Sequence, residues 1–323
     1  MLTEASARAI TGEPDGAPWW SSDDTEAYPV DHELERELMR AALFGGCSAP
    51  RVGPFTVVQR LGAGASSVVY TAWDERLARR VALKIFIAES SATRHQVQGE
   101  ARALALLSHR NVVAVYDVGE WRGHAFIAME LATGTTLACW QAAARRSTAE
   151  LLGAYLQAGR GLAAVHQAGL VHRDFKPANV MVAGDGRVVV TDFGLARSVA
   201  PEPVAAGARD AAEGSALTIQ PAAGTPAYAA PEQCAGAAPH PSADIYSFTV
   251  ALCEALIGRH PRRAAKLMWR LALARRVSRR LYEAICAGLA TRPSARGGTM
   301  APLLAALAPP PRRRAASCHP QVL

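Results

Sequence analysis

Two residue types that are common in soluble proteins, lysine and asparagine, are nearly missing from this sequence. Among 323 residues with 35 Lys and Arg together, only Lys84, Lys176 and Lys266 are lysine, and only Asn111 and Asn179 are asparagine. A coding bias that replaces Lys by Arg and avoids Asn would produce this distribution. Because Arg is a planar fork and Lys a compact point charge, they are not interchangeable in a tight site. We therefore expect the surviving Lys and Asn residues to mark positions where function requires them.

The sequence also lacks cysteine pairs with metal-ligand spacing, long apolar runs and a secretion signal. No apolar run reaches the roughly 18 residues of a membrane span, and the N-terminus has no basic segment followed by an apolar one. Half of the residues are hydrophobic and a fifth are charged, which is typical of a globular protein. These features predict a cytoplasmic protein without a membrane span. They also predict reduced thiols at all six cysteines, which are Cys47, Cys139, Cys234, Cys253, Cys286 and Cys318.

The net charge of +7 is unevenly distributed along the chain. Residues 1–40 carry ten Asp and Glu against three Arg, whereas residues 259–280 carry nine Arg and Lys and no acid. Such a basic segment raises the question of nucleic-acid binding. No aromatic interleaving or helix-turn-helix pattern accompanies it, so we favour a solvated basic face and expect no specific nucleic acid as a partner.

The order of secondary-structure signals predicts a small β-rich lobe followed by a larger helical lobe. Residues 1–50 are acidic and rich in Pro and Gly, and we expect a partly disordered extension with one short helix near Asp31–Leu43. We assign 51–132 to the N-lobe, 133–308 to the C-lobe and 309–323 to a flexible Pro/Arg-rich tail. Strands are expected at Phe55–Leu61, Ser67–Trp73, Arg80–Ile87, Val112–Gly119 and Ala125–Glu130, with one helix at Ala92–Leu107.

Helices are expected to dominate after Thr148. Two short strands, Val180–Val182 and Val188–Thr191, flank Gly184-Asp185-Gly186, which is a favourable hairpin turn. Later helices are predicted at Ala243–Ile257, Arg263–Arg275, Leu281–Leu289 and Met300–Leu307. The fold class is therefore α+β, with two lobes around a cleft.

A glycine-rich segment lies between the first two of these strands. It reads Leu61-Gly-Ala-Gly-Ala-Ser-Ser-Val-Val-Tyr70. Glycines allow a hairpin backbone to approach phosphates and to direct its N–H groups at them. By itself such a segment is more often just a turn. It is not a dinucleotide fingerprint, because a strand follows it instead of a helix.

Lys84 stands in the apolar strand segment Val81-Ala-Leu-Lys84. A buried ammonium needs an anion, although an edge-strand lysine facing water would satisfy the same pattern. On the next helix Glu100 lies between the apolar residues Val97 and Leu104 at helical spacing, so we expect it to pair with Lys84. Glu89 is a weaker rival because it lies outside that stripe.

The most informative block is His172-Arg-Asp-Phe-Lys-Pro-Ala-Asn179, followed by Asp192-Phe-Gly194. Together with the glycine-rich hairpin and the strand lysine, in this order and spacing, it resembles the eukaryotic-type protein kinases, most of all the bacterial serine/threonine kinases. The resemblance runs from about Phe55 to Leu307. It implies a bilobal kinase fold, ATP and Mg²⁺ as cofactors, and transfer of the γ-phosphate of ATP to Ser or Thr hydroxyls of protein substrates, possibly of the chain itself.

The resemblance also implies roles for the residues that match its motifs. Asp174 would accept the proton of the attacking hydroxyl, and Lys176 would steady the γ-phosphate, as in the serine/threonine form of this loop. Lys84 would hold the α- and β-phosphates and pair with Glu100. Asn179 and Asp192 would hold magnesium. Two of the three lysines and one of the two asparagines thus fall on catalytic positions, which favours an active enzyme.

The nucleotide pocket follows from the same resemblance. Its phosphate side would be the hairpin, where Ser67 stands in place of the third glycine of the pattern. Apolar residues would enclose the adenine; without the resemblance, the same residues would be assigned to the hydrophobic core. Together the expected nucleotide-binding residues are Leu61, Gly62, Gly64, Ser67, Val69, Ala82, Lys84, Met129, Glu130, Ala132 and Met181.

The segment from Asp192 to Glu232 would be the activation segment. Its hydroxyls are Ser198, Ser215, Thr218 and Thr225, and Arg173 is a ready partner for a phosphate placed there. We hypothesise that autophosphorylation at Thr218 orders the segment, and that Thr225 supports the catalytic loop.

Two further contacts are expected in the C-lobe. Asp244 would anchor the backbone of the catalytic loop. Glu232 would form a buried ion pair with Arg296, although two unrelated surface charges would leave the same sequence pattern.

The match is weakest between Pro261 and Leu281, where the family usually has about fifteen more residues. The remaining segment is basic, so it could prefer acidic substrates or bind the acidic N-terminal extension.

Three other functions are compatible with parts of this sequence. A pseudokinase scaffold is disfavoured by the intact motifs, a small-molecule kinase by the Thr225–Glu232 segment, and a nucleic-acid binder by the missing recognition pattern.

Overall fold

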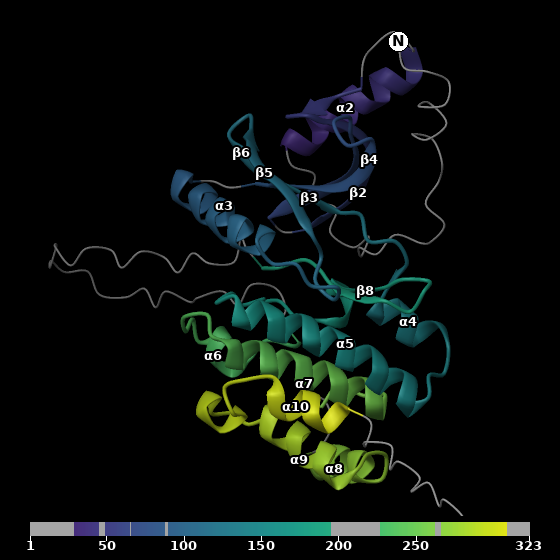
Figure 1. Cartoon of the computed structure of the whole chain (residues 1–323), viewed down its shortest axis with the longest axis vertical. Helices are drawn as coiled ribbons and strands as arrows, with labels where there is room; N and C mark the ends of the chain where they lie inside the picture. The colour runs from purple at the N-terminus through teal and green to yellow at the C-terminus, as the bar shows by residue number, and fades with distance from the viewer. Residues whose placement is uncertain are drawn as a thin grey trace, which may run out of the picture.

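The computed structural model describes residues 29–44, 49–64, 66–87, 90–194, 227–261 and 266–308. These residues form two lobes stacked along the long axis of the molecule, as Figure 1 shows. The first lobe is built on an antiparallel sheet, and the second is mostly helical. The two-lobed α+β arrangement predicted from the sequence is confirmed.

The N-lobe sheet has six strands in the order β1-β2-β3-β4-β6-β5. All neighbouring pairs are antiparallel. The long strands correspond to the predicted ones within a few residues. The strands are β1 (Arg51–Val52), β2 (Phe55–Gly64), β3 (Ser67–Asp74), β4 (Arg79–Phe86), β5 (Val115–Trp121) and β6 (His124–Glu130).

One strand begins later than predicted. Val112 was expected to start the fifth strand, but that strand begins at Val115. Val112 instead forms an isolated bridge with Val190 of the second lobe, and Val113 N–H donates to the Val190 carbonyl at 3.0 Å. The apolar run 112–114 therefore joins the two lobes.

The side chains of the N-lobe sheet alternate between two faces, as the two-residue period of a strand requires. Val68, Val81 and Leu83 point to the outer face and form one buried cluster. Val69 and Ala82 point to the inner face and join the large core that continues into the second lobe. The inner face is therefore the one that lines the cleft.

Helix α2 (Pro29–Phe44) covers the outer face. Its Leu34 is fully buried in the outer cluster, and its Asp31 is also fully buried. Asp31 accepts hydrogen bonds from the Arg60 guanidinium of β2 and from the Tyr70 hydroxyl of β3. The helix predicted near Asp31–Leu43 is present, and it contributes to the core of the N-lobe.

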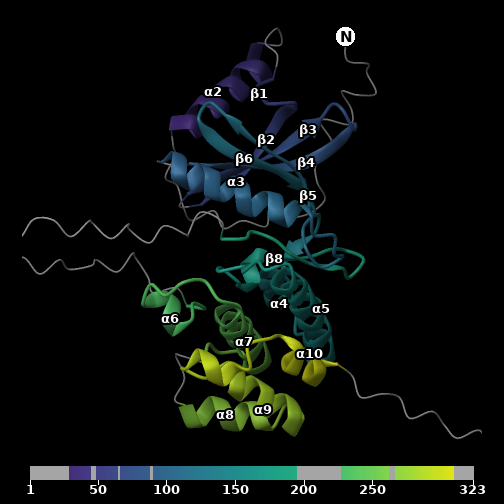
Figure 2. The same cartoon turned by 60° about the vertical axis from the view of Figure 1, so that its left-hand side comes forward.

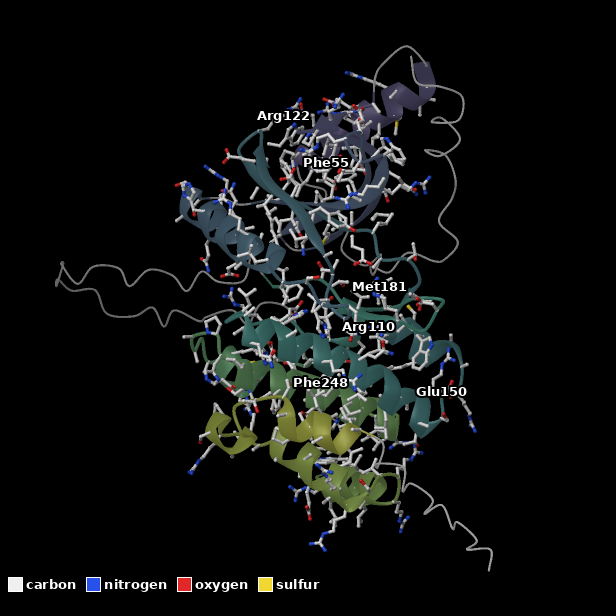
Figure 3. All side chains as sticks on the ribbon, in the orientation of Figure 1. Phe55, Arg110, Arg122, Glu150, Met181 and Phe248 are labelled. Atoms are coloured by element: carbon white, nitrogen blue, oxygen red, sulfur yellow. The ribbon has the colours of Figure 1, made fainter. Side chains whose placement is uncertain are left out.

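Acidic residues of α2 also bind arginines of the N-lobe. Arg122 Nη1 lies 2.6 Å from Glu33 Oε1, in the hairpin at the top of Figure 3. The part of the basic segment 259–280 that forms α8 and the start of α9 lies at the opposite end of the molecule. The acidic residues of α2 therefore do not make the contact with this segment that was considered from charge alone.

Helix α3 (Ser91–Ala105) packs beside β5 and β6 on the inner side of the sheet. The Ser90 side chain caps it by accepting from Thr93 N–H, a typical start of a helix. Val97, Ala101 and Leu104 form its buried stripe. Glu100 lies next to this stripe and faces the second lobe.

The second lobe combines a small sheet with helices. The sheet has the order β7-β8-β9, and the β8–β9 hairpin turns at Gly184-Asp185-Gly186 as predicted. The elements are β7 (Thr135–Thr136), α4 (Leu137–Ala143), α5 (Thr148–Gln167), η1 (Pro177–Asn179), β8 (Val180–Val182), β9 (Val188–Val190), α6 (Pro231–Cys234), α7 (Pro241–Ile257), α8 (Lys266–Ala274), α9 (Arg279–Gly288), η3 (Pro293–Arg296) and α10 (Ala301–Leu307).

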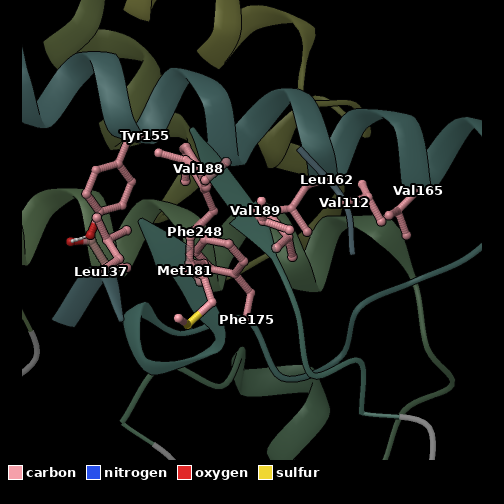
Figure 4. Close-up of a cluster of buried hydrophobic side chains, with 14 of the residues drawn as sticks. Val112, Leu137, Tyr155, Leu162, Val165, Phe175, Met181, Val188, Val189 and Phe248 are labelled. Carbon is pink, nitrogen blue, oxygen red and sulfur yellow. Dashed lines mark hydrogen bonds between the residues drawn. The ribbon is translucent and has the colours of Figure 1, made fainter. Parts of the chain in front are cut away.

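The core of the second lobe forms where α5 and α7 meet the catalytic loop and the small sheet (Figure 4). Tyr155 and Phe248 make an edge-to-face contact, and Phe175 packs against Phe248 with ring centroids 5.5 Å apart. The Tyr155 hydroxyl donates to the Ala251 carbonyl, so its buried polar atom is satisfied. Phe175 immediately follows Asp174, so this packing fixes the position of the candidate site.

Candidate active site

Asp244 holds the backbone of the loop His172–Asn179 from beneath. Its carboxylate accepts from the N–H groups of His172 and Arg173, at 2.7 and 2.8 Å, and from His166 Nε2 at 2.8 Å. Arg173 has a positive φ of 68°, which is uncommon for a residue with a side chain. The predicted anchoring role of Asp244 is confirmed, and the two charge-assisted bonds stabilise this costly backbone conformation.

Three of the predicted catalytic side chains come together on this loop. Asn179 Nδ2 donates to the Asp174 carbonyl at 2.8 Å and to Asp174 Oδ2 at 3.1 Å. Lys176 Nζ lies 3.3 Å from the same Oδ2. Asp174 is thereby fixed with its carboxylate next to a cation, at the mouth of the cleft.

Asp192 reaches this group from the end of β9. Asn179 Nδ2 is 3.5 Å from the Asp192 carbonyl oxygen, and Asp192 itself has a φ of +57°. Gly194 N–H donates to the His172 carbonyl, and His172 Nε2 is 2.9 Å from the Thr191 carbonyl. The loop and the segment 191–194 are therefore joined by the backbone hydrogen bond of Gly194 and by two contacts from the side chains of His172 and Asn179.

Lys84 binds Asp192 in this structure. The Nζ–Oδ1 distance is 2.5 Å, and both side chains are largely buried. Burial alone would raise the pKa of Asp192, but the Lys84 ammonium outweighs it, so the pKa lies below its ordinary value. Lys84 is thus a buried strand lysine with an anionic partner, as the sequence indicated.

The predicted pairing of Lys84 with Glu100 is wrong for this structure. Glu100 Oε1 instead accepts from Arg173 Nη2 at 2.9 Å and from Gln96 Nε2 at 3.1 Å. Two cations lie within reach of the inner side of α3, and the orientation of the helix decides between them. Here Glu100 faces Arg173 and leaves Lys84 to Asp192.

A cavity of about 300 Å³ lies beside this alternative ion pair. Glu100 and Leu104 of α3 line one side, and Arg173 and Phe193 line the other. Two nitrogens of Arg173, Nε and Nη1, are buried there without a hydrogen-bond partner among the described residues. The Arg173 guanidinium therefore has unused donor capacity behind the site.

The glycine-rich segment forms the predicted hairpin. Gly64 pairs with Ser67 across its tip, and a Cβ added at Gly64 would meet open space. Ser67 pairs with Phe86 of β4 on its other side, so the serine that replaces a glycine is an ordinary strand residue. The hairpin lies over the same inner face as Lys84.

The apolar residues predicted to contact adenine share that face. Val69 lies opposite Lys84, and Ala82 lies opposite Met129 in the strand register. Met181 approaches from β8 of the second lobe, between the two lobes in Figure 3. Leu61 is also buried in this cluster, and Ala132 packs against it. These side chains form one continuous apolar wall.

The Glu130 side chain has a structural contact that the sequence analysis missed. Its carboxylate binds the Arg187 guanidinium in a two-pronged pair, with Nη1–Oε1 at 2.5 Å and Nη2–Oε2 at 3.1 Å. This pair ties the strand β6 to the β8–β9 hairpin. Only the backbone of Glu130 is left to contact a ligand, and no sequence signal links these two residues.

Gln233 is a second residue that sequence reasoning missed. Its Nε2 donates to the Arg173 carbonyl at 2.9 Å, and its Oε1 accepts from Ala230 N–H at 3.0 Å. It therefore connects α6 to the strained residue of the catalytic loop. Its place directly after Glu232 was the available signal.

The predicted pair of Glu232 and Arg296 is confirmed. Arg296 Nη1 lies 2.5 Å from Glu232 Oε1, and the guanidinium is fully buried. Burial would raise the pKa of Glu232, but the hydrogen bonds from Arg296 lower it below its ordinary value. The candidate hydroxyls Ser198, Ser215, Thr218 and Thr225 lie outside the described residues.

Among the described residues, no cluster of three or more His, Cys, Asp or Glu side chains could hold a metal ion by itself. Oxygen donors at the site come from Asp174, Asn179 and Asp192.

Within the described part of the chain, none of the helices combines the length and apolar character needed to cross a bilayer.

Comparison with known proteins gives a consistent picture. Residues 55–287 match the family model described as the protein kinase domain. Serine/threonine-protein kinase PknA of Mycobacterium tuberculosis is 34% identical over 227 residues, and PknL of Mycobacterium bovis is 39% identical over 213 residues. These alignments cover 66% and 64% of this chain. They cover 50% of each relative, so the chain spans about half the length of the relatives it matches.

Proposed function

Because the chain belongs to the protein kinase family, we propose that it transfers the γ-phosphate of ATP to serine or threonine hydroxyls of proteins. The observation that carries this proposal is the convergence of Lys84, Asp174, Asn179 and Asp192 at one end of the cleft. The relatives PknA and PknL are both named serine/threonine-protein kinases, which supports the assignment of Ser and Thr as the acceptor residues.

The catalytic loop supplies the groups that act on the hydroxyl. Asp174 accepts the proton as the hydroxyl attacks; Asn179 Nδ2 orients its carboxylate through Oδ2 and also holds its backbone carbonyl. Lys176 lies at 3.3 Å from Asp174 and is partly exposed, so it can turn towards the transferred phosphoryl group. Positioning and charge neutralisation carry the reaction, as is general for phosphoryl transfer.

The donor set at this site fits magnesium. Mg²⁺ prefers hard oxygen ligands, usually carboxylates together with phosphates and water. The side-chain oxygens of Asp192 and Asn179 belong to this class, and the two residues are in hydrogen-bond contact. When bound there, the metal neutralises charge on the phosphates. Lys84 would exchange its contact with Asp192 for the α- and β-phosphates, and the inner-face residues Val69, Ala82, Met129 and Met181 would enclose the adenine.

The ion pairs of the described structure would rearrange during activation. Glu100 would leave Arg173 and pair with Lys84, which would fix the lysine for its phosphate contacts. A phosphate on the activation segment, which we place at Thr218, would compete with Glu100 for the Arg173 guanidinium. Autophosphorylation would then favour the active pairing. If Thr218→Ala leaves the transfer rate unchanged, this regulatory step is incorrect.

The function is tested by incubating the full chain with γ-labelled ATP, magnesium and a generic protein substrate. Wild type should label Ser or Thr, and Asp174→Asn should lose the label by several hundredfold or more, because the proton acceptor is removed. Asp185→Asn is the matched control, since this exposed turn residue lies outside the site and should retain full transfer.

One alternative has an observation in its favour. Lys84 is bonded to Asp192 instead of Glu100, which is an arrangement that a nucleotide-binding scaffold could also keep. Binding of ATP without any label transfer, before or after treatment with an activating kinase, would favour the scaffold. Label on Ser or Thr that disappears in Asp174→Asn would exclude it.

A further inference from the structure

Helix α8 carries an exposed apolar surface at the end of the C-lobe that is opposite to α2 (Figures 1 and 2). Leu267, Met268 and Leu271 are 68%, 65% and 50% exposed. They lie on one side of the helix, because Trp269 and Leu273 point inward and are buried. Three neighbouring large apolar side chains with this exposure indicate an interaction surface rather than scattered surface residues.

Basic residues border this apolar stripe. Arg275 follows the last residue of α8 in the turn that leads to α9, and Arg279 and Arg280 begin α9; all three are exposed. The segment 259–280 contains no acid, and the nearest acidic contact is Glu283, whose Oε1 lies 2.8 Å from Arg279 Nε. We call the six residues Leu267, Met268, Leu271, Arg275, Arg279 and Arg280 the α8 face.

We propose that the α8 face binds the surface of an anionic lipid bilayer. A basic amphipathic helix with protruding leucines is suited to lie in the plane of an interface, with its apolar side chains in the acyl boundary and its cations at the headgroups. The charge complements anionic lipid, and each Arg near such a surface adds roughly fivefold in affinity.

This geometry leaves the cleft free. In Figure 1, α8 and α9 lie at the end of the C-lobe that is away from the N-lobe sheet, whereas Lys84 of β4 binds Asp192 of the second lobe where the two lobes meet. Binding through α8 would therefore bring the candidate site near substrates at a bilayer without covering it. The surface is a property of this chain in addition to the proposed phosphoryl transfer, and its test does not depend on activity.

The test is co-sedimentation of the full chain with vesicles, either of phosphatidylcholine alone or of phosphatidylcholine mixed with phosphatidylglycerol. Wild type should bind the anionic vesicles, and binding should weaken steeply with salt because surface charges are screened. Replacing the cations in Arg275→Gln/Arg279→Gln/Arg280→Gln should weaken binding by about 100-fold. The matched control Arg102→Gln/Arg145→Gln/Arg160→Gln removes the same charge from exposed arginines elsewhere and should weaken it much less.

Insertion of the apolar stripe is tested separately. Leu267→Gln/Leu271→Gln should weaken binding at least tenfold, because two leucines leave the acyl boundary. Leu77→Gln/Leu106→Gln, at positions that are 62% and 89% exposed, should bind like wild type. Circular dichroism should show that all variants are folded.

Two results would overturn the proposal. Equal binding to vesicles with and without phosphatidylglycerol would remove the role of the cations. Unchanged vesicle binding in Leu267→Gln/Leu271→Gln, together with equally strong salt-dependent binding to DNA or to an acidic protein, would mean that the segment attracts polyanions of any kind and does not recognise a bilayer.

Discussion

The strongest stability prediction concerns Arg296, whose guanidinium is fully buried in the C-lobe. It donates five hydrogen bonds: two to the Glu232 carboxylate, and one each to the carbonyls of Ala290, Ser242 and Thr291. All lie between 2.5 and 3.0 Å. The residue therefore joins α6, the start of α7 and the chain after α9.

Replacing Arg296 by Met keeps much of the volume but removes every donor. Breaking a buried ion pair by removing one partner costs about 3 to 5 kcal/mol, because the other charge is left without compensation. Three carbonyls also lose a partner, although Glu232 is not fully buried and water can reach it. We therefore expect Arg296→Met to lower the free energy of unfolding by about 4 kcal/mol.

Urea unfolding followed by circular dichroism measures this loss. With a slope m of about 3 kcal/mol/M, the midpoint should fall by roughly 1.3 M. Arg279→Met is the control, because this arginine forms an exposed i,i+4 pair with Glu283 and its loss should leave the midpoint unchanged. A fall in the midpoint of less than 0.3 M in Arg296→Met, or one equal to that of the control, would refute the reasoning from burial.

Three further predictions use the same unfolding measurement. Asp31→Ala should cost about 2 to 4 kcal/mol, because it leaves the buried Tyr70 hydroxyl without its acceptor and removes the buried one of the two carboxylates that pair with Arg60; Glu35→Ala, which removes the exposed one, should cost far less, and equal losses would contradict the packing of this helix. Gly161→Ala should destabilise by about 2 kcal/mol, since a Cβ there would lie 2.4 Å from the Asn111 carbonyl, whereas Gly153→Ala meets nothing and should be neutral or slightly stabilising. The lowered pKa of Asp192 predicts that its contribution to stability is fully present above its unfolded pKa of about 3.9 and is lost as the pH falls through the lower folded value. The difference between wild type and Asp192→Asn should therefore stay constant from about pH 5 to 7 and change only below about pH 4; a change near neutral pH would contradict this assignment.

The secondary structure could be predicted because it depends on local patterns, whereas the roles of the site residues were inferred from the family resemblance. The two-residue alternation of the strands and the turn at Gly184-Asp185-Gly186 are properties of short segments, and they appear as expected. Asp244 and the Glu232–Arg296 pair were predicted from a family resemblance, which supplies long-range contacts that no local pattern contains.

The partner of Glu100 could not be predicted because the sequence leaves two cations equally available. A carboxylate beside the apolar stripe of α3 needs a cation, and that part of the reasoning holds. Lys84 comes from the sheet and Arg173 from the catalytic loop, so the choice depends on how α3 is rotated and displaced relative to both lobes. That is a property of tertiary arrangement, where a small shift exchanges one ion pair for another.

The contribution of α2 was hidden for a different reason. Residues 29–44 carry four acids and two arginines among scattered apolar residues, and this mixture gives little sign that the helix covers a sheet. The indication that another element covers this face comes from the sequence of the sheet. Tyr70 and Val68 alternate with inward-facing residues, so the outer face of β3 is as apolar as the inner one.

A sheet that is apolar on both faces needs a layer on each side. The second lobe and α3 cover the inner face, which carries Val69, Ala82 and Lys84 and to which the proposed function assigns the nucleotide. The outer face carries none of the proposed ligand contacts, so it can be closed by α2, which contributes buried Val30, Leu34 and Asp31 and partly buried Leu38. Because β2 and β3 carry both the contacts to α2 and the glycine-rich hairpin, the helix restrains the two strands that hold the hairpin over the cleft. Helix α2 is therefore part of the structure that positions the candidate site, although its own described contacts lie on the outer face of the sheet.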